Sequence, residues 1–376
     1  MENITSRELK KINSHQRDYR LDLLKILAIF FVVYYHFNMT GLYITDRDSF
    51  LGVVQNSILI ICSTCIPLFF MVNGALLLNR PSLSIKKHIK KCVLIVLAYF
   101  AWRIITAISI TSANGINLGI KDIIACMFVR ISQVDFSHFW FIPTLISLYI
   151  IYPLFYLLIN ASQTKKDQYT HYMIFLIAFL LFIAIFTGDV NHLQQIFLGD
   201  VLYRIDFEAV SPFNSFKGGF VVYFLVGGLL YKYREQASKI KWFILPMCFA
   251  VGFAILFWYW RSSFEVWDIV YSSYNLLPTI IMSVTLFLLF LRVNNEKLAE
   301  HKLLARAITA TGGNTLTIYY VHWIIGYIIW DNIADGTIAI PFNLGINLIK
   351  CIGLILICTI VGLLLRKIPI LKHLAG

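Results

Sequence analysis

Residues 20–38 read RLDLLKILAIFFVVYYHFN, an apolar run that carries an acid, an amine and an imidazole. An α-helix turns about 100° per residue, so the eleven steps from Lys25 to His36 complete nearly three turns and return to one face. Asp22, three residues before Lys25, lies on the same face. A polar stripe of this kind is costly in lipid, so it predicts a functional site if the helix spans a membrane. Taken singly, Asp22 is also explained as an acidic residue that stabilises the start of a helix. Lys25 is also explained as a lysine whose side chain snorkels to the membrane interface.

The composition indicates an integral membrane protein. Hydrophobic residues make up 59% of the chain and the mean hydropathy is +0.74, whereas soluble domains contain about 45–50% apolar residues. Segments that can cross a hydrocarbon core of about 30 Å as helices need about 20 residues each. Such segments are 21–39, 52–78, 92–112, 139–160, 171–187, 216–232, 242–260, 273–293, 314–331 and 344–365.

A shorter apolar stretch, 120–131, is interrupted by charged residues, and we expect it to be an interfacial helix. The predicted fold class is all-α: a polytopic membrane protein with about ten transmembrane helices in a single domain. This domain covers residues 21–365, between a cytoplasmic N-terminal segment, 1–20, and a cytoplasmic tail, 366–376.

The net charge of +12 follows from topology rather than from a nucleic-acid partner. Lysines and arginines alternate by loop: 23 lie in segments on the side of the N-terminus and only 6 on the other side. Cytoplasmic loops are enriched in these residues, so both termini are predicted to be cytoplasmic. The first apolar run has the length of a membrane span, and we expect it to remain as the first helix.

The sequence lacks the motifs that are typical of metal sites, ATP-driven pumps and hydrolases. Cys62 and Cys65 form a CxxC, but no second pair of ligands lies nearby, so small helix-packing residues are expected and no metal site. The chain contains no GxxxxGK[ST], no HExxH and no GxSxG pattern. Primary pumps, zinc proteases and serine hydrolases are therefore disfavoured.

Two groups of basic residues are candidates for ligand binding. Arg103 lies midway along the third apolar segment, where its permanent charge needs a ligand or counter-ion unless it snorkels to the lipid edge. Lys87, Lys90 and Lys91 belong to a cluster on the cytoplasmic side just before that segment. Such a cluster suits anionic lipid headgroups or the phosphates of a soluble donor.

Further polar residues interrupt other apolar segments. Asn73 precedes Gly74 near the end of the second segment, a pattern that permits close backbone approach. His138 and Trp140 open the fourth segment, and Tyr319 and His322 lie in the ninth. A lone histidine within a membrane segment is often a packing residue, but several in one bundle favour a shared polar cavity.

These motifs, in this order, resemble the membrane acyltransferase 3 family, which O-acylates bacterial surface glycans. The resemblance runs from about Asp18 to Leu365. The motifs that carry it are Arg20-Leu-Asp22-Leu-Leu-Lys25 followed after ten residues by His36, Pro67-Leu-Phe-Phe-Met-Val-Asn73-Gly74, His138-Phe-Trp140-Phe141 with Tyr149 and Pro153, and Tyr319-Tyr-Val-His322. The chain is most similar to the stand-alone group that modifies enterobacterial common antigen and staphylococcal intercellular adhesin.

The resemblance implies a cytoplasmic acyl-CoA donor, most often acetyl-CoA, as co-substrate rather than permanent cofactor. It also implies a glycan hydroxyl as acceptor and a location in the bacterial inner membrane. The chain departs from the family at Lys25, where arginine is common, and at Asn73, where serine is usual. An RxxR-like element is represented only by lysines, and lysine lacks the bidentate phosphate geometry of arginine.

The expected mechanism assigns three sets of residues. His36 is the general base or a transient nucleophile, and Asp22 orients or balances Lys25. The expected donor-binding residues are Arg20, Lys25, Lys87, Lys90, Lys91 and Arg103. The acceptor or oxyanion candidates are Asn73, His138, Trp140, Tyr319 and His322.

Two other classes of function are compatible with a polar intramembrane cavity. A transporter could export a polysaccharide or lipid-linked sugar without acyl transfer, although transporters frequently show paired repeats and this chain shows none. A sensor or scaffold leaves the intramembrane histidines and arginine unexplained. The acceptor sugar, the acyl group and the oligomeric state are left open by the sequence.

Overall fold

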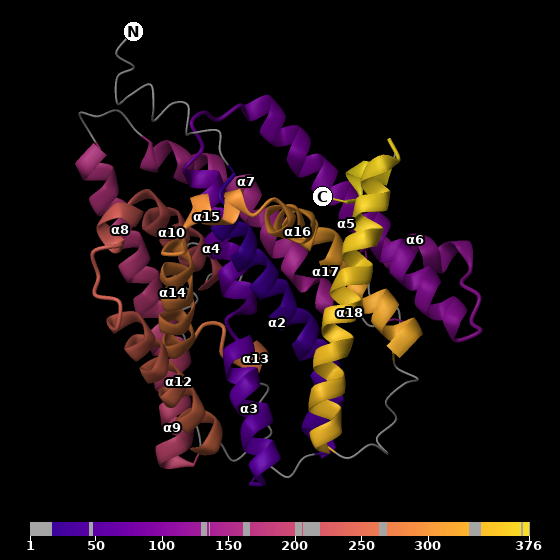
Figure 1. Ribbon diagram of the computed structural model, residues 1–376, viewed down its shortest axis with the longest axis horizontal. Coiled ribbons are helices and arrows are strands. Elements are labelled where there is room, and N and C mark those ends of the chain that lie inside the picture. The colour runs from indigo at the N-terminus through magenta and orange to yellow at the C-terminus, as the bar shows by residue number, and fades with distance from the viewer. Residues whose placement is uncertain are drawn as a thin grey trace.

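The computed structural model describes residues 17–44, 48–128, 134, 136–160, 166–199, 205, 219–262, 269–330, 340–369 and 371–375. These residues form a bundle of helices without strands (Figure 1). The long helices are α2 (Tyr19–Ile44), α5 (Ile85–Ala113), α7 (Phe141–Ile159), α8 (Lys166–Ala184), α12 (Ile244–Ser262) and α18 (Ile340–Lys367). Those of intermediate length are α3 (Phe50–Cys62), α4 (Cys65–Leu78), α10 (Gly219–Lys232), α14 (Leu277–Leu291), α16 (Lys302–Gly312) and α17 (Thr315–Ile325).

The short elements connect or extend these helices. They are α6 (Ile120–Phe128), the 3-10 turn η1 (Ser137–Trp140), the π-helical turn η3 (Ile185–Val190), α9 (Asn191–Leu198), α11 (Arg234–Ala237), α13 (Ile269–Ser272), α15 (Asn295–Glu300), the π-helical turn η6 (Gly326–Trp330) and the 3-10 turn η7 (Leu371–His373).

The predicted all-α class is confirmed, and each of the ten predicted apolar segments coincides with helix in the described residues. Within the described ranges, six helical stretches are long and apolar enough to cross a membrane: Phe50–Leu78, Ile85–Ala113, Ser137–Ile159, Gln168–Leu198, Ile244–Ser262 and Leu344–Lys367. The number of passes stays a prediction. A helix, α6, also forms where we expected the interfacial helix.

The second predicted segment is divided into α3 and α4 by Ser63 and Thr64. Pro67 explains the division, because proline has no N–H to donate and its ring collides with the carbonyl four residues earlier, that of Ser63. The backbone N–H of Ser63 and Thr64 still bonds carbonyls of the preceding turn, so the chain passes from one helix to the next without an unpaired donor there.

Helix α2 lies at the centre of the bundle and packs against α3, α4, α14, α16, α17 and α18 (Figure 1). Its first turn lies close to α15 and α16, at the end of the bundle where α18 finishes. This end carries the loops that the charge pattern assigns to the cytoplasm. We call it the basic end.

Helices α4 and α10 approach each other so closely that their backbones touch. A Cβ on Gly74 would lie 1.8 Å from the carbonyl oxygen of Phe224, and a Cβ on Gly227 would lie 2.2 Å from that of Met71. Small residues let membrane helices pack in this way. The close approach that the Asn73-Gly74 pattern suggests is therefore present, and it holds Asn73 at a fixed place in the bundle.

Pro153 has a comparable effect within α7. Because proline donates no hydrogen bond, the carbonyl of Tyr149 four residues earlier has no partner within the helix. The buried Nε2 of His88 lies 2.7 Å from this oxygen, a distance at which its N–H donates to the carbonyl. This contact ties α5 to α7 beside Tyr149.

Candidate active site

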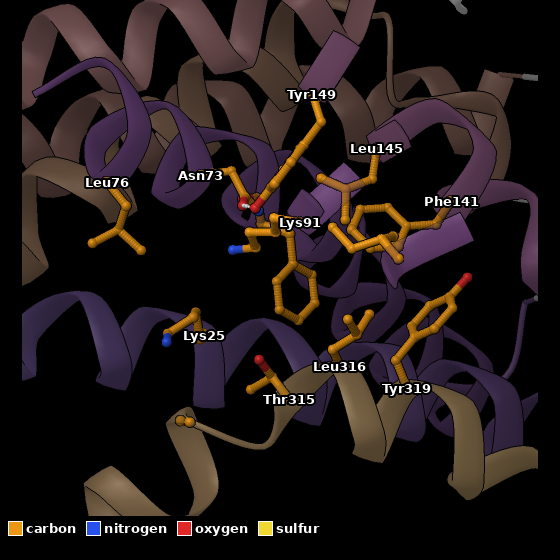
Figure 2. A pocket seen from close by; sticks show the side chains of 14 residues that line it. Lys25, Asn73, Leu76, Lys91, Phe141, Leu145, Tyr149, Thr315, Leu316 and Tyr319 are labelled. Carbon is orange, nitrogen blue, oxygen red and sulfur yellow. Dashed lines mark hydrogen bonds between the residues drawn. The ribbon is translucent and has the colours of Figure 1, made fainter. Parts of the chain in front are cut away.

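A cavity of about 200 Å³ opens among α2, α4, α5, α7 and α17 at the basic end. Two cationic side chains, Lys25 from α2 and Lys91 from α5, line it from different walls (Figure 2). The remaining lining is mostly apolar and aromatic, with the backbone of Gly312 and Gly313 along one side. A small apolar space with a few polar groups is typical of a ligand site.

Lys25 is held by Asp22. Its Nζ lies 2.6 Å from Oδ1 of Asp22, while Nε of Arg17 lies 2.5 Å from Oδ2 of the same carboxylate. Asp22 is only 4% exposed, so its charge depends on these two cations. Gly312 makes room for it, because a Cβ there would lie 2.7 Å from that of Asp22. The predicted pairing of Asp22 with Lys25 is therefore present as an ion pair.

Asn73 and Tyr149 form the opposite wall (Figure 2). The Tyr149 hydroxyl donates to Oδ1 of Asn73 at 3.2 Å, and the Asn73 amide donates to the carbonyl of Phe69 at 2.8 Å. The Nζ of Lys91 lies 5.2 Å from the centre of the Tyr149 ring, within reach of a cation–π contact. These contacts hold the side chains of Asn73 and Tyr149 in the wall of the cavity, facing the lysines.

Phe141 and Tyr319 lie together at one end of the cavity (Figure 2). Their ring centroids lie 5.2 Å apart. Tyr319 is buried, and its hydroxyl donates to the carbonyl of His138. Tyr319 therefore contacts the cavity on one side and the segment of His138 on the other.

Beyond Tyr319, three histidines from three parts of the chain gather around Trp323. The ring of His36 lies 5.4 Å from that of His322 and 5.2 Å from that of Trp323. His138 stacks on Trp323 at 4.8 Å and lies 6.2 Å from His322. The His322 ring is 5.9 Å from that of Tyr319. The cavity and the histidine cluster (His36, His138 and His322) are thus in contact through one tyrosine.

The hydrogen bonding of His322 indicates which ring nitrogen can accept a proton. Its Nδ1 lies 3.0 Å from the carbonyl of Ile318, which can only accept, so Nδ1 carries the hydrogen. Nε2 is then unprotonated; it is buried and has no hydrogen-bond partner among the described residues. Both ring nitrogens of His138 are also buried, and the part of the chain that the structure describes offers them no hydrogen-bond partner. Buried polar atoms of this kind need an explanation, such as a bound ligand, a water molecule or a role in proton transfer.

Other residues that the sequence singles out lie away from this cavity. The Arg20 guanidinium pairs with Asp18 at 2.7 Å and donates to the carbonyl of Leu291. Burial favours the neutral acid of Asp18, but the hydrogen bonds and charge of Arg20, with the Tyr231 hydroxyl, outweigh this and lower its pKa. Arg20 thus anchors the start of α2.

Lys87 and Lys90 are exposed on the first turns of α5 and do not line the cavity. Arg103 is buried beside α6, where its Nε donates to the carbonyl of Cys126 at 2.6 Å. Trp140 contacts the rings of Phe220 and Tyr274 rather than the histidine cluster.

Two parts of the site were missed in the sequence. Trp323 separates His36 from His138, and its place directly after His322 is the one signal that could have identified it. Arg17 completes the ion pairs of Asp22, but it lies before the apolar run, where the sequence pattern does not distinguish it from the other basic residues of the N-terminal segment. Among the described residues, no group of three histidine, cysteine or acidic side chains could hold a metal ion.

A family model described as an acyltransferase domain covers residues 18–366. This stretch contains every residue that lines the cavity and the whole histidine cluster. No curated protein and no solved structure matches the chain.

Proposed function

Because the chain belongs to the membrane acyltransferase 3 family and is a membrane acyltransferase, we propose that it moves an acyl group from cytoplasmic acyl-CoA to a glycan. The acyl group is acetyl or another short acyl group. The acceptor is a hydroxyl of a surface polysaccharide or of its lipid-linked precursor. The proposed location is the bacterial inner membrane with both termini in the cytoplasm, and the nearest activity is that of the stand-alone modifiers of surface antigens and adhesins.

The observation that carries this proposal is the contact between the cationic cavity and the histidine cluster through Tyr319. Lys25 and His36 are separated by about 16 Å along α2 at 1.5 Å per residue. A donor with an anionic end and a long arm fits this arrangement. Its anionic part would lie at the basic end, its arm would pass Lys25 and Lys91, and its thioester would reach the histidines once the Tyr319 side chain moves aside.

The reaction needs a base for the acceptor hydroxyl. His36 would take the hydroxyl proton while the hydroxyl oxygen attacks the thioester carbonyl carbon. When the tetrahedral intermediate collapses, the carbon–sulfur bond breaks and His36 returns the proton to the leaving thiolate. The products are the O-acyl ester and free coenzyme A, so atoms and charges balance. A transient acyl-histidine gives the same products in two steps.

His322 supports His36 in this scheme. Its hydrogen bond to Ile318 fixes the tautomer, so the unprotonated Nε2 is available in the cluster next to the His36 ring. His138 and Trp323 enclose the other side and limit access of water. Exclusion of water protects the thioester from hydrolysis. Arg20, Lys87, Lys90, Arg103 and Trp140 have no direct part in the proposed reaction.

The test measures acetyl transfer from radiolabelled acetyl-CoA to surface glycan in purified membranes. We expect His36→Ala to lower the rate by about 10²–10⁴-fold, the usual contribution of a general base. His171→Ala, an exposed histidine on α8, serves as the control and should retain the wild-type rate. Wild-type transfer by His36→Ala at equal protein level would remove His36 from the mechanism.

The same assay separates the enzyme from a transporter of polysaccharide or lipid-linked sugar. Label on the glycan supports acyl transfer, whereas glycan translocation without label supports transport. The family membership favours the enzyme. No described feature requires transport.

A further inference from the structure

A second cavity, of about 510 Å³, lies at the basic end beside the one that contains Lys25. Gly313 lines both. Four cationic side chains from three separate parts of the chain line this second cavity: Arg17, Lys302, Arg306 and Arg366. No carboxylate is among the described residues that line it. We call it the four-cation cavity.

Two of these cations, Lys302 and Arg306, lie on one side of α16. Lys302, Arg306 and Thr309 are spaced by four and three residues and share a face, while Ala305 and Ile308 are buried. Arg366 reaches the cavity from the last turn of α18, where its Nε donates to Oδ1 of Asn314 at 2.7 Å. The cations thus come from elements that are held to one another by hydrogen bonds.

A general excess of cytoplasmic charge does not account for this arrangement. The topological rule requires lysines and arginines on the cytoplasmic side, but it does not require three segments to converge on one hollow. Arg17 is paired with Asp22, but no described lining residue offers a carboxylate to Lys302 or Arg306, so a bound anion would reduce the repulsion between these like charges. Arginines in particular match phosphate geometry, which the lysines of the first cavity do not.

The small size of the first cavity also indicates that part of the donor binds outside it. Its 200 Å³ is below the usual range of about 300–1,000 Å³ for small-molecule sites. A donor that carries both an acyl arm and a phosphorylated nucleotide therefore has to extend beyond it. The four-cation cavity adjoins it at Gly313 and also offers the polar side chains of Thr309 and Asn314.

We propose that the four-cation cavity binds the phosphate groups at the nucleotide end of the acyl donor. This inference rests on the proposed function, since it assigns a place to a part of the same co-substrate. The acyl arm then passes Gly312 and Gly313 into the first cavity. An anionic lipid headgroup carries the same phosphate chemistry, so the experiment has to separate the two sources.

The test is a binding measurement on the full chain in nanodiscs of phosphatidylcholine. The probe is adenosine 3′-phosphate 5′-diphosphate, the nucleotide end of coenzyme A, with ADP as the analogue that lacks the 3′-phosphate. We expect the double variant Lys302→Gln and Arg306→Gln to raise the Kd of the probe at least about tenfold. Lys297→Gln, an exposed lysine on α15 that does not line the cavity, should leave the Kd unchanged.

A second arm uses nanodiscs that contain phosphatidylglycerol. If wild type does not bind the probe but retains this lipid through purification, and the double variant loses it, the occupant is a headgroup and the nucleotide assignment is overturned. An unchanged Kd in the double variant overturns it as well.

Failure of this inference and failure of the proposed function give different results. Binding is measured without turnover, so a protein that binds the probe but transfers no acyl group refutes the function and keeps the site. A protein that transfers acyl groups with unchanged Kd and KM in the double variant refutes only the site.

Discussion

Lys25 illustrates how one residue serves both stability and binding. Its ammonium neutralises the buried Asp22 and also lines the cavity that faces Lys91. A lysine that merely snorkels to the interface would do neither. The ion pair positions the charge at a fixed height on α2, below His36 by about three helical turns.

We predict that Lys25→Met raises the KM for acyl-CoA about tenfold and changes kcat less. The thioether chain keeps the packing but removes a positive charge from the cavity through which the arm of the donor passes, and a tenfold change corresponds to about 1.4 kcal/mol. Lys25→Arg keeps the charge and should stay within a few-fold of wild type. Steady-state kinetics in membranes measure both, and an unchanged KM in Lys25→Met would return this residue to a purely structural role.

At the scale of the residue, the sequence predicts which side chains share the polar face of α2 but not which residues of other helices surround them. Helical periodicity suffices to place Asp22, Lys25 and His36 on one face, because they lie on one helix. The meeting of His36 with His322 and Trp323 depends on how α2 packs against α17, which no local pattern encodes. The same holds for Arg103, since only the tertiary structure reveals its partner on α6.

At the scale of elements, the backbone contact of α4 with α10 fixes one wall of the cavity. Asn73 lies next to Gly74 on α4, so any change in the separation of the two helices also moves the Asn73–Tyr149 hydrogen bond. The sequence indicates the glycine but not its partner helix. The sequence also predicts a single span where the structure has two helices divided near Pro67. Both α3 and α4 are apolar, so the hydropathy pattern shows no boundary between them.

We predict that Gly227→Ala lowers the free energy of unfolding by about 1–3 kcal/mol and reduces activity. The new methyl group would meet the backbone of Met71, which cannot move as a flexible side chain can, and overpacking costs about this much. Gly353→Ala on α18 is the matched control, since nothing lies within 4 Å of its Cβ position. Alanine favours helix over glycine by about 0.8–1.0 kcal/mol, so the control should be neutral or slightly stabilising.

Melting of the purified protein in detergent distinguishes the two variants. Equal melting temperatures for Gly227→Ala and Gly353→Ala would show that the α4–α10 contact tolerates an extra carbon. In that case the wall that carries Asn73 would not depend on glycine at position 227.

At the scale of the whole molecule, the side of the membrane to which the cavities open decides whether the proposed donor can reach them. Both the Lys25 cavity and the four-cation cavity lie at the basic end, with α15, α16 and the end of α18. The charge count predicts that this end faces the cytoplasm, the side from which the proposed acyl-CoA donor would come. The histidine cluster lies deeper in the bundle, so donor and acceptor would approach it from opposite sides.

We predict that a membrane-impermeant maleimide labels Lys121→Cys on intact spheroplasts, whereas Lys297→Cys is labelled only after permeabilisation. Lys121 is exposed on α6 beyond the far end of α5, and Lys297 is exposed on α15 at the basic end. Replacing Cys92 and Cys248 by serine removes the native thiols that are not fully buried. The reverse labelling pattern would place both cationic cavities outside the cell, away from acyl-CoA, and would contradict the proposed donor while leaving the family membership intact.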